Sequence, residues 1–213
     1  MPIRHHMTDA LLLAYSAGQL SEAFNLVVAA HLSMCDECRA QAGAFDAVGG
    51  AMLEHAPASE MGGGSLAQTM ARIAAAPATP RAAAPRRGLL PGPVRDYVGG
   101  DLDAVRWRPV GMGVRQAILP TAPGAKARLL HIPAGQAVPD HGHRGMELTL
   151  VLRGAFRDAT DRFAPGDVEI AAEDLEHTPV AEAGEDCLCL AATDAPLRFT
   201  ALLPRMLQPL FRI

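Results

Sequence analysis

The stretch HLSMCDEC, residues 31–38, decides how the N-terminal part of this chain folds. It sets one imidazole and two thiols in the pattern H-x3-C-x2-C. On a helix, His31 and Cys35 lie one turn apart on the same face, and the Cys-x-x-Cys step keeps Cys38 close to Cys35. Three ligands of a tetrahedral zinc ion therefore come from a single turn region.

The fourth zinc ligand has to come from another segment. The nearest candidates are His5 and His6, just before the first expected helix, and we favour His6. Cys35 and Cys38 have two other interpretations, as buried small side chains or as a thioredoxin-like redox pair. A thioredoxin-type pair follows a strand of a βαβ unit, whereas this pair lies among helical patterns. We therefore predict a structural zinc site.

Charge and hydropathy narrow the class of protein. The chain has 213 residues, a net charge of −4 and an isoelectric point near 6.0. This balance offers no broad basic field for direct nucleic-acid binding, so we expect protein partners. No apolar run reaches the roughly 18 residues that span a bilayer, and the apolar stretch near the N-terminus is too short for a secretory signal. We expect a cytoplasmic protein with no membrane contact.

The first quarter of the chain is patterned as helices, up to about residue 55. After a glycine run, Leu66, Met70 and Ile73 recur at helical spacing and form a short amphipathic stripe. This stripe either folds back on the helical bundle or docks in a groove on a partner. A stretch rich in Ala, Pro and Arg follows, which is typical of a linker. The predicted parts are a zinc-binding helical domain over residues 1–75, a linker over 76–93 and a metal-binding domain over 94–213.

From about Asp96 the pattern changes to short β-type runs separated by turns, which favours a β-sandwich or barrel. His141 and His143 point to the same face of a strand, and Glu147 returns to that face. Two imidazoles and a carboxylate then meet inside the barrel, as metal binding requires. Cys187 and Cys189 share one face of a later strand. They are either core residues or, if they face the interior, thiols that meet the metal or become oxidised.

The segment from Gly135 to Gly154 resembles the first cupin motif, G-x5-H-x-H-x3-E-x6-G, and matches it at every fixed position. The second cupin motif brings one more histidine, and His177 falls at its place. Three positions depart from the Pro, Gly and Asn that are common in this motif: Ala172, Asp174 and Ala181. These departures weaken the match of the turn but keep the ligand.

Taken together, the two halves resemble the ChrR-type zinc-binding anti-sigma factors, a zinc anti-sigma domain fused to a cupin. The resemblance implies an α+β multidomain fold, with a zinc-bound helical bundle followed by a double-stranded β-helix. It implies two zinc sites, one per domain: His6, His31, Cys35 and Cys38 in the first, and His141, His143, Glu147 and His177 in the second. It also implies a 1:1 complex with an extracytoplasmic-function sigma factor, released by a stress such as singlet oxygen through the cupin domain.

The alternative is a metal-dependent cupin enzyme of the dioxygenase or isomerase type, with the helices as a partner-binding module. The cupin ligand set alone does not separate catalysis from sensing. We favour the regulator because the sequence shows no additional acid–base pair beside the expected metal ligands. A helical zinc module also has no evident purpose in a small cupin enzyme.

Overall fold

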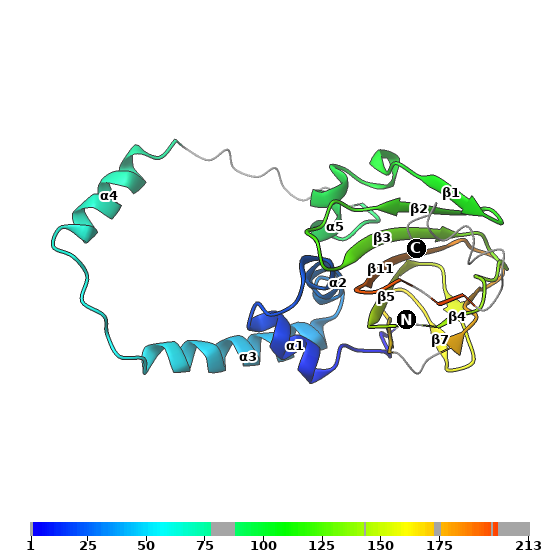
Figure 1. Cartoon of the computed structure of the whole chain (residues 1–213), viewed down its shortest axis with the longest axis horizontal. Coiled ribbons are helices and arrows are strands. Elements are labelled where there is room, and N and C mark those ends of the chain that lie inside the picture. The colour runs from blue at the N-terminus through cyan, green and yellow to red at the C-terminus, as the bar shows by residue number, and fades with distance from the viewer. Residues whose placement is uncertain (1, 78–87, 143, 173–175, 197, 200–213) are drawn as a thin grey trace.

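The computed structural model describes residues 2–77, 88–142, 144–172, 176–196 and 198–199. Helices fill the N-terminal part, and the strands that follow form a β-sandwich (Figure 1). The predicted α+β architecture is confirmed. Within the described residues, no helix is both long and apolar enough to cross a membrane.

The α-helices among the described residues are α1 (Asp9–Ser16), α2 (Glu22–Leu32), α3 (Asp36–Glu54), α4 (Ser65–Ala75) and α5 (Gly92–Val98). Side-chain caps set two of their starts. The hydroxyl of Thr8 accepts a hydrogen bond from the N–H of Leu11 at the start of α1. Cys35 caps α3, because its sulfur accepts a hydrogen bond from the N–H of Cys38 at 3.5 Å. The start of α3 therefore fixes both thiols of the Cys-x-x-Cys step.

One face of the sandwich is a six-stranded antiparallel sheet in the order β1-β2-β3-β11-β5-β8. Its strands are β1 (Arg108–Gly111), β2 (Val114–Ile118), β3 (Lys126–Ile132), β5 (Glu147–Arg153), β8 (Val168–Ala171) and β11 (Cys187–Thr193). One smaller sheet contains β6 (Phe156–Arg157), β7 (Arg162–Phe163) and β10 (Val180–Ala181). The other contains β4 (His141–Gly142), β9 (Glu176–His177) and β12 (Arg198–Phe199).

Strand β11 lies between β3 and β5 and is buried on both faces. Its alternate side chains enter two different cores, as the period of a strand requires. Leu188 and Leu190 face the helices, whereas Cys187 and Cys189 face the interior of the sandwich. The interior core also contains Phe156 and other side chains of the sheet formed by β6, β7 and β10.

The helices and the six-stranded sheet share one hydrophobic core. Helix α2 packs over β3, β5 and β11, and its Val27 and Val28 are fully buried in the same cluster as Leu188 and Leu190. A helical bundle of this size has too little core to be stable alone, and the outer face of the sheet supplies the rest. The helices are therefore packed against the sandwich and do not form a free-standing bundle.

The region where we expected the linker to end differs from the expectation. Leu90 is only 2% exposed and belongs to the shared core. The carboxylate of Asp101 accepts hydrogen bonds from the N–H groups of Leu89 and Leu90. Helix α5 then starts with proline in its first turn, where the missing N–H costs nothing. Residues 78–87 lie outside the described part, so the domain boundaries stay a prediction.

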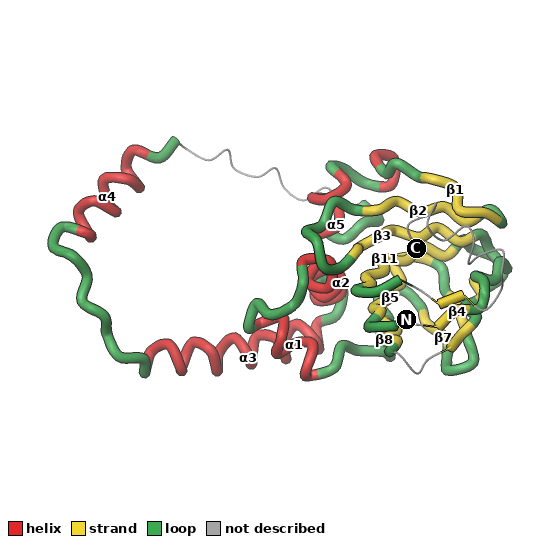
Figure 2. The backbone as a smooth tube through the Cα atoms, in the orientation of Figure 1, coloured by secondary structure: helices red, strands yellow, loops and turns green. Residues whose placement is uncertain are grey.

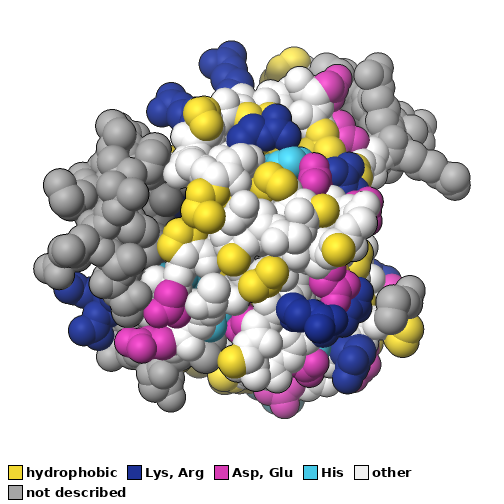
Figure 3. Space-filling model, turned by 90° about the vertical axis from the view of Figure 1, so that its right-hand side faces the viewer, with side chains coloured by type: hydrophobic (Ala, Val, Ile, Leu, Met, Phe, Trp, Pro, Cys, Tyr) yellow, Lys and Arg dark blue, Asp and Glu magenta, His cyan; other side chains and the backbone are white. Residues whose placement is uncertain are grey.

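The last turns of α3 and the whole of α4 extend away from the body (Figures 1 and 2). None of the residues of α4 is buried, so the amphipathic stripe does not fold back on the bundle. The end of the molecule opposite α4, formed by the sandwich, has a mixed surface. There, basic, acidic and apolar side chains alternate without a broad basic field (Figure 3).

Candidate metal centres

His6, His31, Cys35 and Cys38 come together in the helical part. Each offers one nitrogen or sulfur atom, and these four atoms all lie within 4.8 Å of one another. His31 projects from the end of α2, the two cysteines from the start of α3, and His6 from the extended segment before α1. All four residues are at least partly shielded from solvent, and His31 is fully buried.

The spacing of these atoms suits a tetrahedral zinc ion. Nδ1 of His6 lies 3.3 Å from the sulfur of Cys35 and 3.5 Å from that of Cys38. With typical zinc bond lengths, a nitrogen and a sulfur on one tetrahedral ion are separated by about 3.5 Å. The geometry therefore agrees with the predicted donor set, and these residues could hold a metal.

The ring of His31 is turned so that one nitrogen remains available. Its Nδ1–H donates a hydrogen bond to the carbonyl oxygen of Gly166 at 2.9 Å. This leaves the lone pair on Nε2, which is buried and has no hydrogen-bond partner among the described residues. A buried nitrogen without a partner costs free energy, and a metal would satisfy it.

The structure separates the two candidates for the fourth ligand. His6 joins the group, and its Nε2 lies 3.6 Å from a carboxylate oxygen of Glu37. The ring of His5 turns the other way, where its Nε2 lies 3.0 Å from the carboxylate of Asp161 and the ring contacts Phe163. The geometry thus supports our preference for His6.

Burial changes the acid–base properties of this group. It raises the pKa of the Cys38 thiol to about 11 and lowers the pKa of His31. Both shifts have the same cause, because burial disfavours the charged form of each group. A divalent metal would supply the positive charge that thiolates need here.

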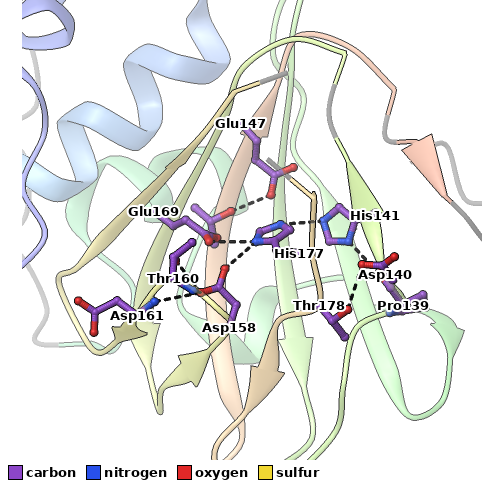
Figure 4. A network of polar contacts seen from close by, with 11 residues as sticks. Pro139, Asp140, His141, Glu147, Asp158, Thr160, Asp161, Glu169, His177 and Thr178 are labelled. Atoms are coloured by element: carbon purple, nitrogen blue, oxygen red, sulfur yellow. Dashed lines mark hydrogen bonds and ion pairs between the residues drawn. The ribbon is translucent and has the colours of Figure 1, made fainter. Parts of the chain in front are cut away.

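A second centre lies inside the sandwich (Figure 4). His141 on β4 pairs with His177 on β9, and their Nε2 atoms face each other at 3.2 Å. The Nδ1–H of His141 donates to the carbonyl oxygen of Pro139 at 2.8 Å. Two imidazole nitrogens on one tetrahedral zinc ion are separated by about 3.3 Å, so the two rings are arranged as metal ligands are.

Glu147 enters the same interior from β5, as predicted, and its carboxylate accepts a hydrogen bond from the hydroxyl of Thr149. His143, the remaining predicted ligand, lies outside the described residues. Two acidic residues that we did not predict complete the centre. His177 donates from Nδ1 to Asp158 at 2.9 Å and to Glu169 at 3.0 Å.

Asp158, Glu169 and His177 also form a group that could hold a metal themselves. Burial raises the pKa of Glu169 to about 7. It acts to lower the pKa of His177, but Glu169 and Asp158 outweigh it and raise that pKa to about 9. Such carboxylate partners orient a metal-binding histidine and make it a stronger ligand. Because Asp158 lies in the turn after β6 and Glu169 lies on β8, sequence spacing gives no signal for them.

Cys187 and Cys189 lie in the same interior, with their sulfur atoms 3.5 Å apart. The hydrogen bond from one thiol to the other, together with burial, raises the pKa of Cys189 well above its ordinary value. Neither thiol belongs to a metal group among the described residues. Their position agrees with the interpretation as core residues.

Helices that carry a His/Cys group, packed on a β-sandwich with a buried histidine pair, define a two-part protein in which each part has residues that could hold a metal. A family model described as the ChrR cupin-like domain matches residues 96–196. The whole chain is 65% identical to the anti-sigma-E factor ChrR of Cereibacter sphaeroides, and the alignment covers 100% of both proteins. The chain therefore belongs to the ChrR family of anti-sigma factors, which are regulators.

Solved structures agree with this assignment. The crystal structure of Rhodobacter sphaeroides SigE in complex with the anti-sigma ChrR contains a chain that is 64% identical. The match has a TM-score of 0.80 and covers 90% of this chain and 99% of that one. An RmlC-like cupin from Ralstonia eutropha is 22% identical, with a TM-score of 0.43 over 48% of this chain and 71% of its own.

Proposed function

We propose that this chain is a cytoplasmic anti-sigma factor that binds an extracytoplasmic-function sigma factor in a 1:1 complex and makes no direct contact with nucleic acid. The observation that carries the proposal is two sets of uncovered apolar side chains, one on the last turns of α3 and one on α4, which together we call the α3/α4 surface. Its side chains are between 57 and 76% exposed: Val48, Met52, Leu53, Leu66, Met70 and Ile73.

An apolar surface of this kind is costly in water and marks a place where another protein binds. The stripe on α4 has the i, i+4, i+7 spacing of a helix that docks in a groove. Nothing in the described part of the chain packs against it. The relative in the SigE complex supports a sigma factor as the protein that covers it, because its fold matches this chain over both parts.

The proposed role of the first metal is structural. Zinc held by His6, His31, Cys35 and Cys38 joins the N-terminal segment, α2 and α3, and so sets the direction in which α3 leaves the body. The energy of a structural zinc site, on the order of 10–16 kcal/mol in small zinc peptides, is ample for this purpose.

The proposed role of the second metal is sensing. Zinc at His141, His143, Glu147 and His177 sits in the cupin part, where oxidation of a ligand by singlet oxygen weakens the centre and favours release of the sigma factor. The packing of α2 on β11 and β5 gives such damage a route to the helices. To shift the sigma factor from almost fully bound to almost fully free, the free energy of binding must change by about 5.5 kcal/mol. The loss of a firmly bound metal is a change on this scale.

The test of the partner uses isothermal titration of the full chain with SigE of Rhodobacter sphaeroides. Leu66→Asp combined with Met70→Asp places charge on the α3/α4 surface, and we expect binding to be lost. Met112→Asp is the matched control, because Met112 is equally exposed, at 64%, but lies on the turn between β1 and β2. Equal binding of both variants would contradict the proposed surface.

The test of sensing uses His141→Ala. We expect this variant to inhibit a sigma-dependent promoter as before, because the α3/α4 surface is intact, but not to release it under light with a photosensitiser. Normal induction in this variant would show that the signal enters elsewhere.

A further inference from the structure

The first metal centre is not built by the helical part alone. Its most deeply buried ligand, His31, has its Nδ1–H bonded to a carbonyl of the sandwich, that of Gly166, at 2.9 Å. This bond selects the tautomer that leaves Nε2 free to bind a metal. The sequence alone does not predict this contact, because 135 residues separate His31 and Gly166.

Gly166 is held in a conformation that suits this role. Its φ angle is +93°, which favours glycine. A Cβ atom at this position would lie 2.6 Å from the side chain of Ile3, so the N-terminal segment lies directly over the turn. A larger residue would push this segment away and move the carbonyl that orients His31.

The next residue, Asp167, fixes the segment that carries His6. Its buried carboxylate accepts hydrogen bonds from the N–H groups of Arg4 at 2.6 Å and of His5 at 3.0 Å. The same carboxylate accepts from the N–H of Ala164 at 2.8 Å, which closes the turn. His6 follows these two amides immediately, so its position depends on Asp167.

The backbone of β8 continues this contact. The N–H of Val168 donates to the carbonyl oxygen of His5 at 3.1 Å. One residue further along β8, Glu169 accepts a hydrogen bond from His177 of the second centre. A cavity of about 590 Å³ lies along this junction, between residues 4–6 and β8. The stretch from Gly166 to Glu169 therefore touches both centres.

We propose that residues 164–168 of the sandwich are a structural part of the first metal site, with Asp167 as its positioning residue and the Gly166 carbonyl as the hydrogen-bond partner of His31. The inference rests on the metal-binding role proposed for His6, His31, Cys35 and Cys38. Occupancy of this site and docking of the helices on the sandwich are then linked, so each stabilises the other.

The experiment measures metal affinity in the full chain with Co²⁺ and competing Zn²⁺. Cobalt bound by thiolates shows an intense near-ultraviolet charge-transfer band, which reports the first centre alone because the residues of the second centre include no thiol ligand. Asp167→Asn places an amide N–H against backbone N–H groups. We expect a loss of affinity of about 10-fold or more, the usual effect of removing a partner of metal ligands, and a weaker band.

The matched control is Asp101→Asn. Asp101 also accepts three backbone hydrogen bonds, from Leu89, Leu90 and Leu102, but it lies away from both centres. The variant Asp101→Asn reproduces the cost of disturbing a carboxylate that accepts three backbone hydrogen bonds. We expect its metal affinity to be unchanged. Equal affinities in the two variants would overturn the proposal.

Two further outcomes are informative. If Asp167→Asn does not fold, Ile3→Ala takes its place, because it loosens the N-terminal segment where it lies over Gly166 and leaves the hydrogen bonds of Asp167 intact; a weaker affinity then supports the proposal and an unchanged one refutes it. A missing thiolate band in the unaltered chain would refute both the metal site and this inference. Because no sigma factor enters the experiment, the proposal of sigma binding is tested separately.

Discussion

The hydroxyl of Tyr97, on α5, donates a hydrogen bond to the carboxylate of Glu22, on α2, at 2.6 Å. This hydrogen bond joins α5 to α2, the helix that carries His31. The bond to Glu22, with a smaller effect of burial, raises the pKa of Tyr97 to about 12.

This shift predicts a pH dependence. A raised pKa means that the contribution to stability is present below the ordinary tyrosine pKa of about 10 and is lost as pH rises toward 12. Tyr97→Phe should therefore be less stable than the unaltered chain at about pH 8, and most of the difference should be lost at about pH 11.5. Denaturant midpoints at the two pH values measure it, with Tyr15→Phe as control. A difference that does not change with pH would contradict the assignment.

The first metal centre predicts a selective effect of Cys35→Ser. The variant should lose one zinc per chain, and hydrogen exchange should accelerate in α1 and α3. Helix α2 should stay protected, because the sheet holds it. The control is Cys187→Ala, which also removes a buried thiol and should keep its zinc. Full zinc content in Cys35→Ser, measured by atomic absorption, would be incompatible with the site.

The shared core predicts that helices and sandwich unfold together. Leu188→Ala removes a fully buried side chain between α2 and the sheet and should cost about 2–5 kcal/mol. The exposed Leu53 serves as control, since Leu53→Ala should change stability by less than about 0.5 kcal/mol.

Two probes follow this unfolding. Circular dichroism reports the helices, and fluorescence of Trp107, the single tryptophan, reports the start of the sandwich. Both transitions should shift together in Leu188→Ala. A fluorescence transition that moves while the helical signal stays in place would show that the two parts are independent.

The second centre predicts a role for Glu169 as the partner of His177. Glu169→Ala should weaken zinc binding at this centre by about 10-fold to 100-fold. The measurement is made in the Cys35→Ser background, so that the first centre does not contribute. Glu185→Ala is a suitable control, because Glu185 is an exposed acidic residue that pairs with Arg153. Equal zinc affinity in both variants would remove Glu169 from the centre.

Local patterns carried most of the fold. Helix starts at Thr8 and Cys35 follow from capping and spacing, and His141 and His177 fall on strands, as the β-type pattern predicts. The group of His31, Cys35 and Cys38 could be predicted for the same reason, since its members are close in sequence. The choice of His6 over His5 needed the structure, because Asp161 and Asp167 decide which ring turns away.

Contacts between segments that are far apart in the sequence could not be predicted. Asp158 and Glu169 have no spacing relation to His177 that marks them as its partners. The packing of α2 on β11 depends on two apolar faces that each look like the core of a separate domain. The Ala, Pro and Arg content of residues 76–93 predicted a linker, whereas Leu90 in this range is part of the core.

The most direct test of the whole account is isothermal titration of SigE with the zinc-loaded chain and with the variant Cys35→Ser, Cys38→Ser. The account predicts a 1:1 complex with the loaded chain. It predicts affinity weaker by about 100-fold, or about 2.7 kcal/mol, for the variant, because α3 loses the metal that sets its direction. Equal affinity of the two proteins, or no binding by the loaded chain, would contradict it.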